Sequence, residues 1–252
     1  MIFWALGAGY GALVLPACGD APRPLAVHAG MSSGSAHCLN LAVNGSLAAA
    51  GVNHRGQLGF ASESMLVKLP RSVPGLPPVA VAIAGNAHSV VLTIDGRVFT
   101  FGDNRYGQLG SPQPSFTSSA RPVDISEPIG AIASGGAHAL ALATNGHLYG
   151  WGSNEDMQLG LHSGRFASRP VRLPLDMPGK AIGAAAAYSA VLLQDGAVEL
   201  WGAGRRARHC CWPDATGVSV NSSGVVLRSG TVQVHEIPLS EIRVSTPVTA
   251  SC

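Results

Sequence analysis

Residues 85–110 read GNAHSVVLTIDGRVFTFGDNRYGQLG. Residues 34–59, GSAHCLNLAVNGSLAAAGVNHRGQLG, and residues 135–160, GGAHALALATNGHLYGWGSNEDMQLG, align with it without a gap. All three copies share a Gly-x-x-His start, an Asn-Gly or Asp-Gly dipeptide in the middle and a Gln-Leu-Gly end. Self-similarity at a spacing of about 50 residues indicates a protein built from repeated supersecondary units.

Two weaker copies follow the three clear ones. The fourth copy, AAAAYSAVLLQDGAVELWGAG at 184–204, has Tyr188 in the place of the histidine. The fifth copy, NSSGVVLRSGTVQVHE at 221–236, keeps only an apolar strand, a Ser-Gly turn and the next strand. We therefore expect residues 1–252 to form one domain of repeats. Its expected parts are clear repeats over 34–204, a degenerate repeat over 205–236 and closing half-repeats over 1–30 and 237–252.

Each repeat has the pattern of short strands joined by tight turns. Asp95-Gly96 and Asn145-Gly146 are dipeptides favoured in two-residue hairpin turns, because both central positions need a positive φ. The runs at 89–93 and 97–101 are rich in β-branched and aromatic residues, as strands are. Gly45, Gly96 and Gly146 occupy the same place in the three copies, so we expect a structural role for them.

The spacing of the copies also predicts the structure of segments whose local sequence is ambiguous. The alanine-rich stretch 181–193 would be predicted as helix in isolation, but its place in the repeat predicts a strand. Proline-rich segments at 70–78, 112–122 and 170–178 are predicted to connect one unit to the next. A unit of about 50 residues with several short strands is typical of one β-propeller blade, which cannot bury its faces alone. The fold class predicted is therefore all-β, a propeller of four-stranded blades.

The repeat resembles one known family. Its pattern is Gly-x-x-His, then x-x-Gly-x-Val-Tyr-x-Trp-Gly-x-Asn, then Gly-Gln-Leu-Gly, which is similar to the repeat of the regulator of chromosome condensation family. The resemblance covers nearly the whole chain, is strong from 34 to 204 and is weak beyond about 205. It implies a propeller, usually of seven blades, although 252 residues are too few for seven typical blades.

The two ends of the chain suggest how the ring closes. Ile2–Gly7 matches the second half of a repeat, and residues 242–250 could supply the missing first half. Strands of the Trp-Gly type are then expected near residues 4, 50, 101, 151, 201 and 234. This spacing predicts six blades, one of them completed by strands from both termini. A worn or truncated seven-blade ring is the alternative.

Charge, hydropathy and cysteine content argue against several classes of protein. A net charge of +2 is too small for a surface that binds nucleic acid by neutralising phosphates. The uncharged segment 1–18 is interrupted by glycines and lacks a basic start, so we expect neither a membrane span nor a processed leader. Five cysteines without CxxC spacing favour reduced thiols. We therefore expect a monomer in the cytoplasm, the nucleus or both.

The sequence contains no motif that predicts catalysis or metal binding. His37, His88 and His138 recur once per copy, so we expect each of them to hydrogen-bond within its own blade rather than to share a metal ion. No nucleophile elbow, phosphate-binding loop, paired carboxylates or metal-ligand motif occurs. The expectation is a protein that is not an enzyme, without cofactor, metal or catalytic residue.

The loops that follow the Trp-Gly-type strands carry much of the scarce charge. Equivalent loops of a propeller emerge on one face, and exposed charged or aromatic residues on a rigid scaffold are good partner contacts. Simple solvation of loops is the competing explanation. The run 205–208 could also be an import signal or a contact for an acidic partner. The candidate partner-binding residues are His54, Arg55, Asp103, Arg105, Tyr106, Glu155, Asp156, Arg205 and Arg206.

The resemblance implies two alternative functions. Small stand-alone propellers of the fungal alpha-tubulin suppressor type, similar to this chain in architecture, imply a non-catalytic interaction scaffold. Its partner would be a small zinc-binding protein or an Elongator-linked factor in diphthamide synthesis or tRNA wobble-uridine modification. The alternative is a guanine-nucleotide exchange factor for a Ran-type small GTPase. No basic N-terminal tail for nucleosomes is present, and direct nucleic-acid binding is not expected.

Overall fold

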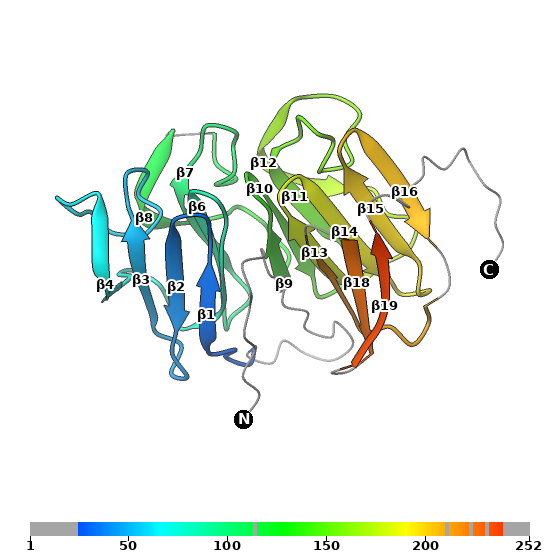
Figure 1. Ribbon diagram of the computed structural model, residues 1–252, viewed down its shortest axis with the longest axis horizontal. Helices are drawn as coiled ribbons and strands as arrows, with labels where there is room; N and C mark the ends of the chain where they lie inside the picture. Colours follow the sequence, from blue (N-terminus) through cyan, green and yellow to red (C-terminus); the bar gives the residue numbers. More distant parts are fainter. Residues whose placement is uncertain (1–24, 113–114, 210–211, 222–223, 230–231, 239–252) are drawn as a thin grey trace.

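The computed structural model describes residues 25–112, 115–209, 212–221, 224–229 and 232–238. Every regular element in these ranges is a strand, and the strands form five antiparallel sheets, each with its strands in chain order. The sheets are the blades of a β-propeller (Figure 1). The all-β propeller predicted from the repeat is therefore confirmed.

Four blades have four strands each and the fifth has three. Blade 1 comprises β1 (Gly30–Ser33), β2 (His37–Leu41), β3 (Leu47–Val52) and β4 (Leu66–Ser72). Blade 2 comprises β5 (Val79–Ala84), β6 (His88–Thr93), β7 (Val98–Asp103) and β8 (Phe116–Pro122). Blade 3 comprises β9 (Ile129–Ser134), β10 (His138–Ala143), β11 (Leu148–Ser153) and β12 (Phe166–Leu173). Blade 4 comprises β13 (Gly179–Ala185), β14 (Tyr188–Leu193), β15 (Val198–Gly202) and β16 (Arg205–His209). Blade 5 comprises β17 (Gly217–Val220), β18 (Gly224–Ser229) and β19 (Val232–Pro238).

Five of the six predicted Trp-Gly-type strands are present as third strands of the blades. They are β3, β7, β11, β15 and β19, near residues 50, 101, 151, 201 and 234. The sixth, near residue 4, and the closure by 242–250 lie outside the described residues. The described part of the chain therefore has five blades where the sequence predicts six in all. The worn fifth repeat still forms a sheet, although that sheet has three strands.

The turns between second and third strands have the predicted geometry. Gly45, Gly96 and Gly146 have φ values of 79°, 81° and 86°, so each occupies the left-handed region that glycine tolerates. The alanine-rich stretch 181–193 is extended as predicted, but it spans parts of two strands, β13 and β14, with a turn between them.

The predicted proline-rich connectors need a correction. They do not lie between blades only, because Pro70, Pro122 and Pro170 belong to the fourth strands β4, β8 and β12. A fourth strand is the outer edge of its blade, where a proline is tolerated because one side of the strand has no pairing partner.

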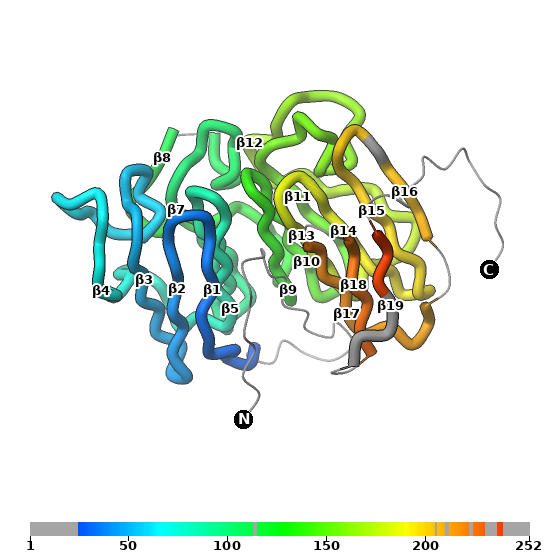
Figure 2. Tube along the Cα trace, in the orientation of Figure 1, coloured from blue at the N-terminus to red at the C-terminus, as the bar shows by residue number. Residues whose placement is uncertain are grey.

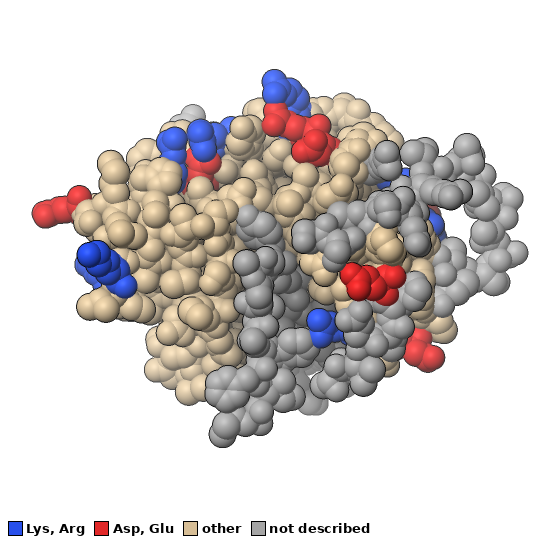
Figure 3. All heavy atoms as spheres, in the orientation of Figure 1, with Lys and Arg blue, Asp and Glu red and all other residues tan. Residues whose placement is uncertain are grey.

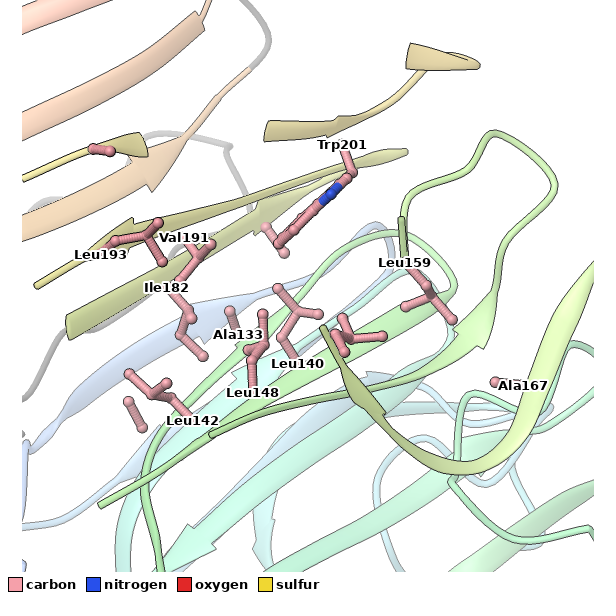
Figure 4. Packing of buried hydrophobic residues seen from close by; sticks show 14 residues of the cluster. Ala133, Leu140, Leu142, Leu148, Leu159, Ala167, Ile182, Val191, Leu193 and Trp201 are labelled. Carbon is pink, nitrogen blue, oxygen red and sulfur yellow. The ribbon is translucent and has the colours of Figure 1, made fainter. Parts of the chain in front are cut away.

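Successive blades pack face to face in chain order, as the path of the Cα trace shows (Figure 2). The first strand of each blade contacts the inner strands of the preceding one. Between blades 3 and 4, Leu140 and Leu148 meet Ile182 and Val191, and Trp201 covers this layer from blade 4 (Figure 4). Burying both faces of each sheet in this way is what a single blade cannot achieve alone.

The repeated histidines join neighbouring blades. The Nε2 atoms of His37, His88 and His138 lie 2.9, 3.0 and 2.8 Å from the hydroxyl oxygens of Ser89, Ser134 and Ser189. Each serine belongs to the blade that follows the blade of its histidine. The expectation of a hydrogen bond within each blade was wrong. The apolar faces between blades leave a buried imidazole few polar partners, and the serine of the next blade provides one.

Burial keeps these histidines neutral. Desolvation lowers the pKa of His37 and of His138 to about 4. The pKa of His88 falls to about 3, because desolvation is reinforced by the charges that His37 and His138 would carry. In His37, Nε2 must be the donor, since the Ser89 hydroxyl donates its own hydrogen to the carbonyl oxygen of Gln57 at 2.9 Å.

The glycine of the Gly-x-x-His motif makes room for the imidazole. A Cβ on Gly135 would lie 2.1 Å from Cε1 of His138 and 2.7 Å from the carbonyl oxygen of Ala186 in the next blade. A Cβ on Gly85 would lie 2.3 Å from Cε1 of His88. In the Gly-x-x-His motif, the histidine therefore bridges two blades, and the glycine has no side chain that would collide with the imidazole.

Candidate functional site

Three loops join the third to the fourth strand in blades 1, 2 and 3, at 53–59, 104–110 and 154–160, and we call them the rim loops. They emerge together along the upper edge of the molecule in Figure 1. Each begins with an asparagine whose side chain closes the loop. The Oδ1 atoms of Asn53, Asn104 and Asn154 accept the backbone N–H groups of Leu58, Leu109 and Leu159 at 3.0, 3.0 and 3.1 Å.

A buried glutamine supports each rim loop from inside. The Oε1 atoms of Gln57, Gln108 and Gln158 accept backbone N–H groups two residues earlier in the chain, at 2.9, 2.8 and 2.9 Å. The three glutamines are almost fully buried. Fixed asparagine and glutamine side chains hold the loop backbone in one conformation, so the exposed residues between them have defined positions.

The glycine that ends each Gln-Leu-Gly sequence lies against an aromatic ring of the next blade. A Cβ on Gly110 would lie 3.3 Å from the indole of Trp151, and a Cβ on Gly160 would lie 2.6 Å from the indole of Trp201. Gly59 faces the ring of Phe101 in the same way. This close packing ties every rim loop to two blades.

Five of the predicted contact residues stand exposed on the rim. They are His54, Arg105, Tyr106, Glu155 and Asp156, and Arg55 is half-buried. Figure 3 shows charged groups gathered along this upper edge, whereas the surface over β1 to β3 is uncharged in the same view. Glu155 pairs with Arg165, a residue that the sequence analysis did not select. The structure therefore brings these residues together along one edge.

Asp103 has a different position from the one expected. Its side chain is 3% exposed, because it ends strand β7 and points under the loop. Arg105 donates to it from Nε at 2.9 Å, and Gln108 donates from Nε2 at 3.0 Å. Asp103 therefore holds the loop and orients Arg105 instead of facing solvent.

Residues 205–209, where Arg205 and Arg206 were expected as contact residues on an exposed loop, form the strand β16. A turn at Ala203 and Gly204, both with positive φ, joins it directly to β15. Arg206 pairs at 2.8 Å with Glu199, whose side chain is 1% exposed, and its guanidinium lies over the ring of Trp201. The interpretation of this run as an exposed basic loop was wrong, because pairing with β15 directs Arg206 toward a buried carboxylate.

Sequence reasoning missed a row of exposed apolar residues. Leu66, Phe116 and Phe166 are the first residues of β4, β8 and β12, with exposures of 51%, 46% and 53%. They occupy equivalent places directly after the rim loops, at nearly the same distance beyond the three Gln-Leu-Gly sequences. That regular offset in the sequence could have predicted the row. Exposed aromatic and aliphatic side chains beside charged loops are typical of protein contact surfaces.

The described residues hold no cluster of three or more His, Cys, Asp or Glu side chains that could bind a metal ion. Within the same ranges, no helix is long and apolar enough to cross a bilayer. The arrangement on the rim is one of polar, charged and apolar side chains on fixed loops, which suits recognition of another molecule by contact.

Comparison with known proteins identifies the repeat. Residues 79–108 and 131–158, and in a second match residues 95–142 and 145–193, fit the family described as Regulator of chromosome condensation (RCC1) repeat. The chain is an RCC1-like repeat propeller. The crystal structure of human WBSCR16 has a similar fold, with a TM-score of 0.69 and 23% identity over 83% of this chain. Prp20p from Saccharomyces cerevisiae gives a TM-score of 0.66 with 22% identity over 80% of this chain.

Curated relatives match the RCC1-like propeller over part of its length. The protein named "Probable E3 ubiquitin-protein ligase HERC6" from Homo sapiens is 44% identical over 89 residues, which is 33% of this chain and 9% of that protein. Protein RCC2 from Mus musculus is 40% identical over 78 residues, 30% of this chain and 15% of that protein. The chain also spans 62% of the WBSCR16 chain and 56% of the Prp20p chain.

Proposed function

We propose that this RCC1-like propeller is a non-catalytic scaffold that binds another protein through its rim. The observation that carries the proposal is the row of rim loops, each fixed by an asparagine and a buried glutamine and each presenting exposed charged or aromatic residues. Arg105 and Tyr106 stand at the middle of this row, and Phe116 borders them. Rigid loops lose little conformational entropy on binding, which favours recognition by contact.

The similarity to Prp20p supports a protein as the partner. That structure is described with the binding properties of Prp20p to Gsp1p and histones, and a second structure has yeast RCC1 (Prp20) bound to Kap60. For the scaffold we propose a small zinc-binding protein or an Elongator-linked factor as partner, on the resemblance to the alpha-tubulin suppressor type. The alternative function is guanine-nucleotide exchange on a Ran-type GTPase.

Replacing Tyr106 with Ala is expected to weaken partner binding by about tenfold to a hundredfold, because aromatic residues near the centre of an interface carry much of its free energy. Partners would be captured by crosslinking, identified by mass spectrometry and then purified for isothermal titration against both chains. A zinc-binding protein or an Elongator-linked factor supports the scaffold. Nucleotide release from a Ran-type GTPase, accelerated by the wild-type chain, supports the alternative.

Arg97→Gln is the matched control for the rim. Arg97 is 58% exposed beside Asp95, as Arg105 is 53% exposed beside Asp103, but the two arginines flank opposite ends of β7. Arg97→Gln should therefore leave binding unchanged, whereas Arg105→Gln should weaken it. Equal losses from both variants would show that the rim is not the contact surface.

A further inference from the structure

The three rim loops differ in one internal contact. In blade 2, the Nε2 atom of Gln108 donates to Asp103 at 3.0 Å. In blade 3, the Nε2 atom of Gln158 donates to the hydroxyl of Ser153 at 3.1 Å. The same place in blade 1 holds Val52, which pairs with the first residue of its fourth strand just as Asp103 and Ser153 do. Valine offers no acceptor, so the blade 1 loop lacks the oxygen that the other two supply.

The missing oxygen leaves buried donors unused in blade 1. Gln57 is 0% exposed, and its Nε2 atom has no hydrogen-bond partner. Its Oε1 accepts the N–H of Arg55 just as its counterparts accept the N–H groups of Tyr106 and Asp156, so the amide is anchored as it is in blades 2 and 3. The Nε atom of Arg55, in the same loop, is also buried without a partner. Buried donors are normally paired, so unpaired ones need an explanation.

The surroundings of these donors are positive and apolar. The loop 53–59, NHRGQLG, contains the cation Arg55 and no acidic residue. Met65 and Leu66 border it with exposures of 74% and 51%, and Asn53 donates its N–H to the carbonyl of Met65 at 2.7 Å. Glu63, the acidic residue of the same β3–β4 connection, makes no ion pair among the described residues.

We propose that the blade 1 rim loop is a docking site for an acidic side chain of a protein partner. The carboxylate lies beside Val52 and accepts hydrogen bonds from Gln57 Nε2 and from Arg55, as Asp103 accepts them from Gln108 and Arg105 in blade 2. Val52 and Arg55 are only half-buried, and the long Arg55 side chain swings aside to admit the carboxylate. Apolar residues next to the acid in the partner lie on Met65 and Leu66. This inference rests on the proposed scaffold function, since it names a chemical feature of the partner.

A carboxylate fits these donors better than a nucleic acid does. In blade 2 the equivalent glutamine already binds a carboxylate, since Gln108 and Arg105 both donate to Asp103. Nucleic acids are held by many cations along a phosphate backbone. Here one loop carries the donors, and its neighbours are exposed aliphatic side chains that match the apolar residues of a peptide.

Peptide selection tests the site. Random 12-residue peptides displayed on phage would be selected on the full chain, and the best would be synthesised for titration calorimetry. We expect an enriched Asp or Glu flanked by apolar residues. Changing that acid to its amide should weaken binding at least about tenfold, because charge-assisted hydrogen bonds are lost. Val52→Asp should weaken it at least as much, because its own carboxylate takes the donors and repels the peptide.

Val52→Ala is the matched control, since it shortens the same side chain without supplying an oxygen, and it should bind within about twofold of wild type. Circular dichroism would establish that both variants fold. The proposal fails if the selected peptides lack an acid, if Val52→Asp binds them like wild type, or if no peptide binds. It also fails if single-stranded DNA binds wild type and Val52→Asp abolishes that binding. Peptides that lose affinity with Tyr106→Ala but not with Val52→Asp would preserve the scaffold function and remove this site.

Discussion

Lowering the pH from 7.5 to 5.5 is expected to reduce the free energy of unfolding by about 4 kcal/mol, through the three histidines that bridge the blades. Their pKa values are about 4, 3 and 4 in the folded chain, against 6.5 for an ordinary histidine. Unfolding at pH 5.5 therefore takes up a proton at each site. The stabilisation is fully present above pH 6.5 and is lost as the pH falls toward 4. Each histidine contributes about 1.4 kcal/mol per pH unit within that window.

Urea unfolding followed by tryptophan fluorescence at pH 7.5, 6.5 and 5.5 measures this effect. His138→Gln keeps a polar partner for Ser189 but takes up no proton, so it should remove about a third of the pH dependence. His28, whose pKa burial also lowers, acts in the same direction. The lowered pKa values of Asp95 and Glu127 cost stability only at more acidic pH, below their ordinary values of 3.8 and 4.5. Identical urea midpoints at pH 7.5 and 5.5 would contradict the neutral buried histidines.

Trp151→Ala is expected to lower the free energy of unfolding by about 3–5 kcal/mol, because it opens a large cavity between blades 2 and 3. Trp151 is 0% exposed, and its indole N–H donates to the carbonyl of Gln108 at 3.0 Å. The substitution removes apolar contacts, leaves that carbonyl unpaired and takes away the ring on which Gly110 rests. Equilibrium urea unfolding at pH 7.5 measures the loss.

Phe166→Ala is the control for this experiment. Phe166 is also aromatic and lies in the same blade, but it is 53% exposed, so its removal should cost less than about 1 kcal/mol. If Trp151→Ala were no more destabilising than Phe166→Ala, the packing between blades would not be the main source of stability.

The repeat predicted the fold well because its residues act locally. The Asn-Gly and Asp-Gly turns need only their own backbone, and strand runs beside them follow from composition, so the blades and their turns were confirmed. A repeat with fixed offsets also places each loop on one edge, which is why most of the predicted contact residues stand together there.

Partners in the next blade could not be read from the sequence. His37 and Ser89 are 52 residues apart, and no local rule pairs them across a blade boundary. Asp103 and Arg206 were taken for solvent-facing charges, because their pairing depends on where a strand ends. Asp103 lies at the end of β7, and Arg206 lies on a strand that begins after a two-residue turn. Position relative to a strand end decides whether such a charge faces solvent.

The composition of the outer strands also bears on how two molecules meet. The strands β4, β8 and β12 read LVKLPRS, FTSSARP and FASRPVRL, with five basic residues, three prolines and no acidic residue. An open strand edge is a template for aggregation, and like charges together with prolines lacking an N–H discourage such pairing. Two chains approaching edge to edge would bring arginines against arginines. The outer strands of the propeller are thereby protected against edge-to-edge polymerisation. The rim loops stay available for a different molecule.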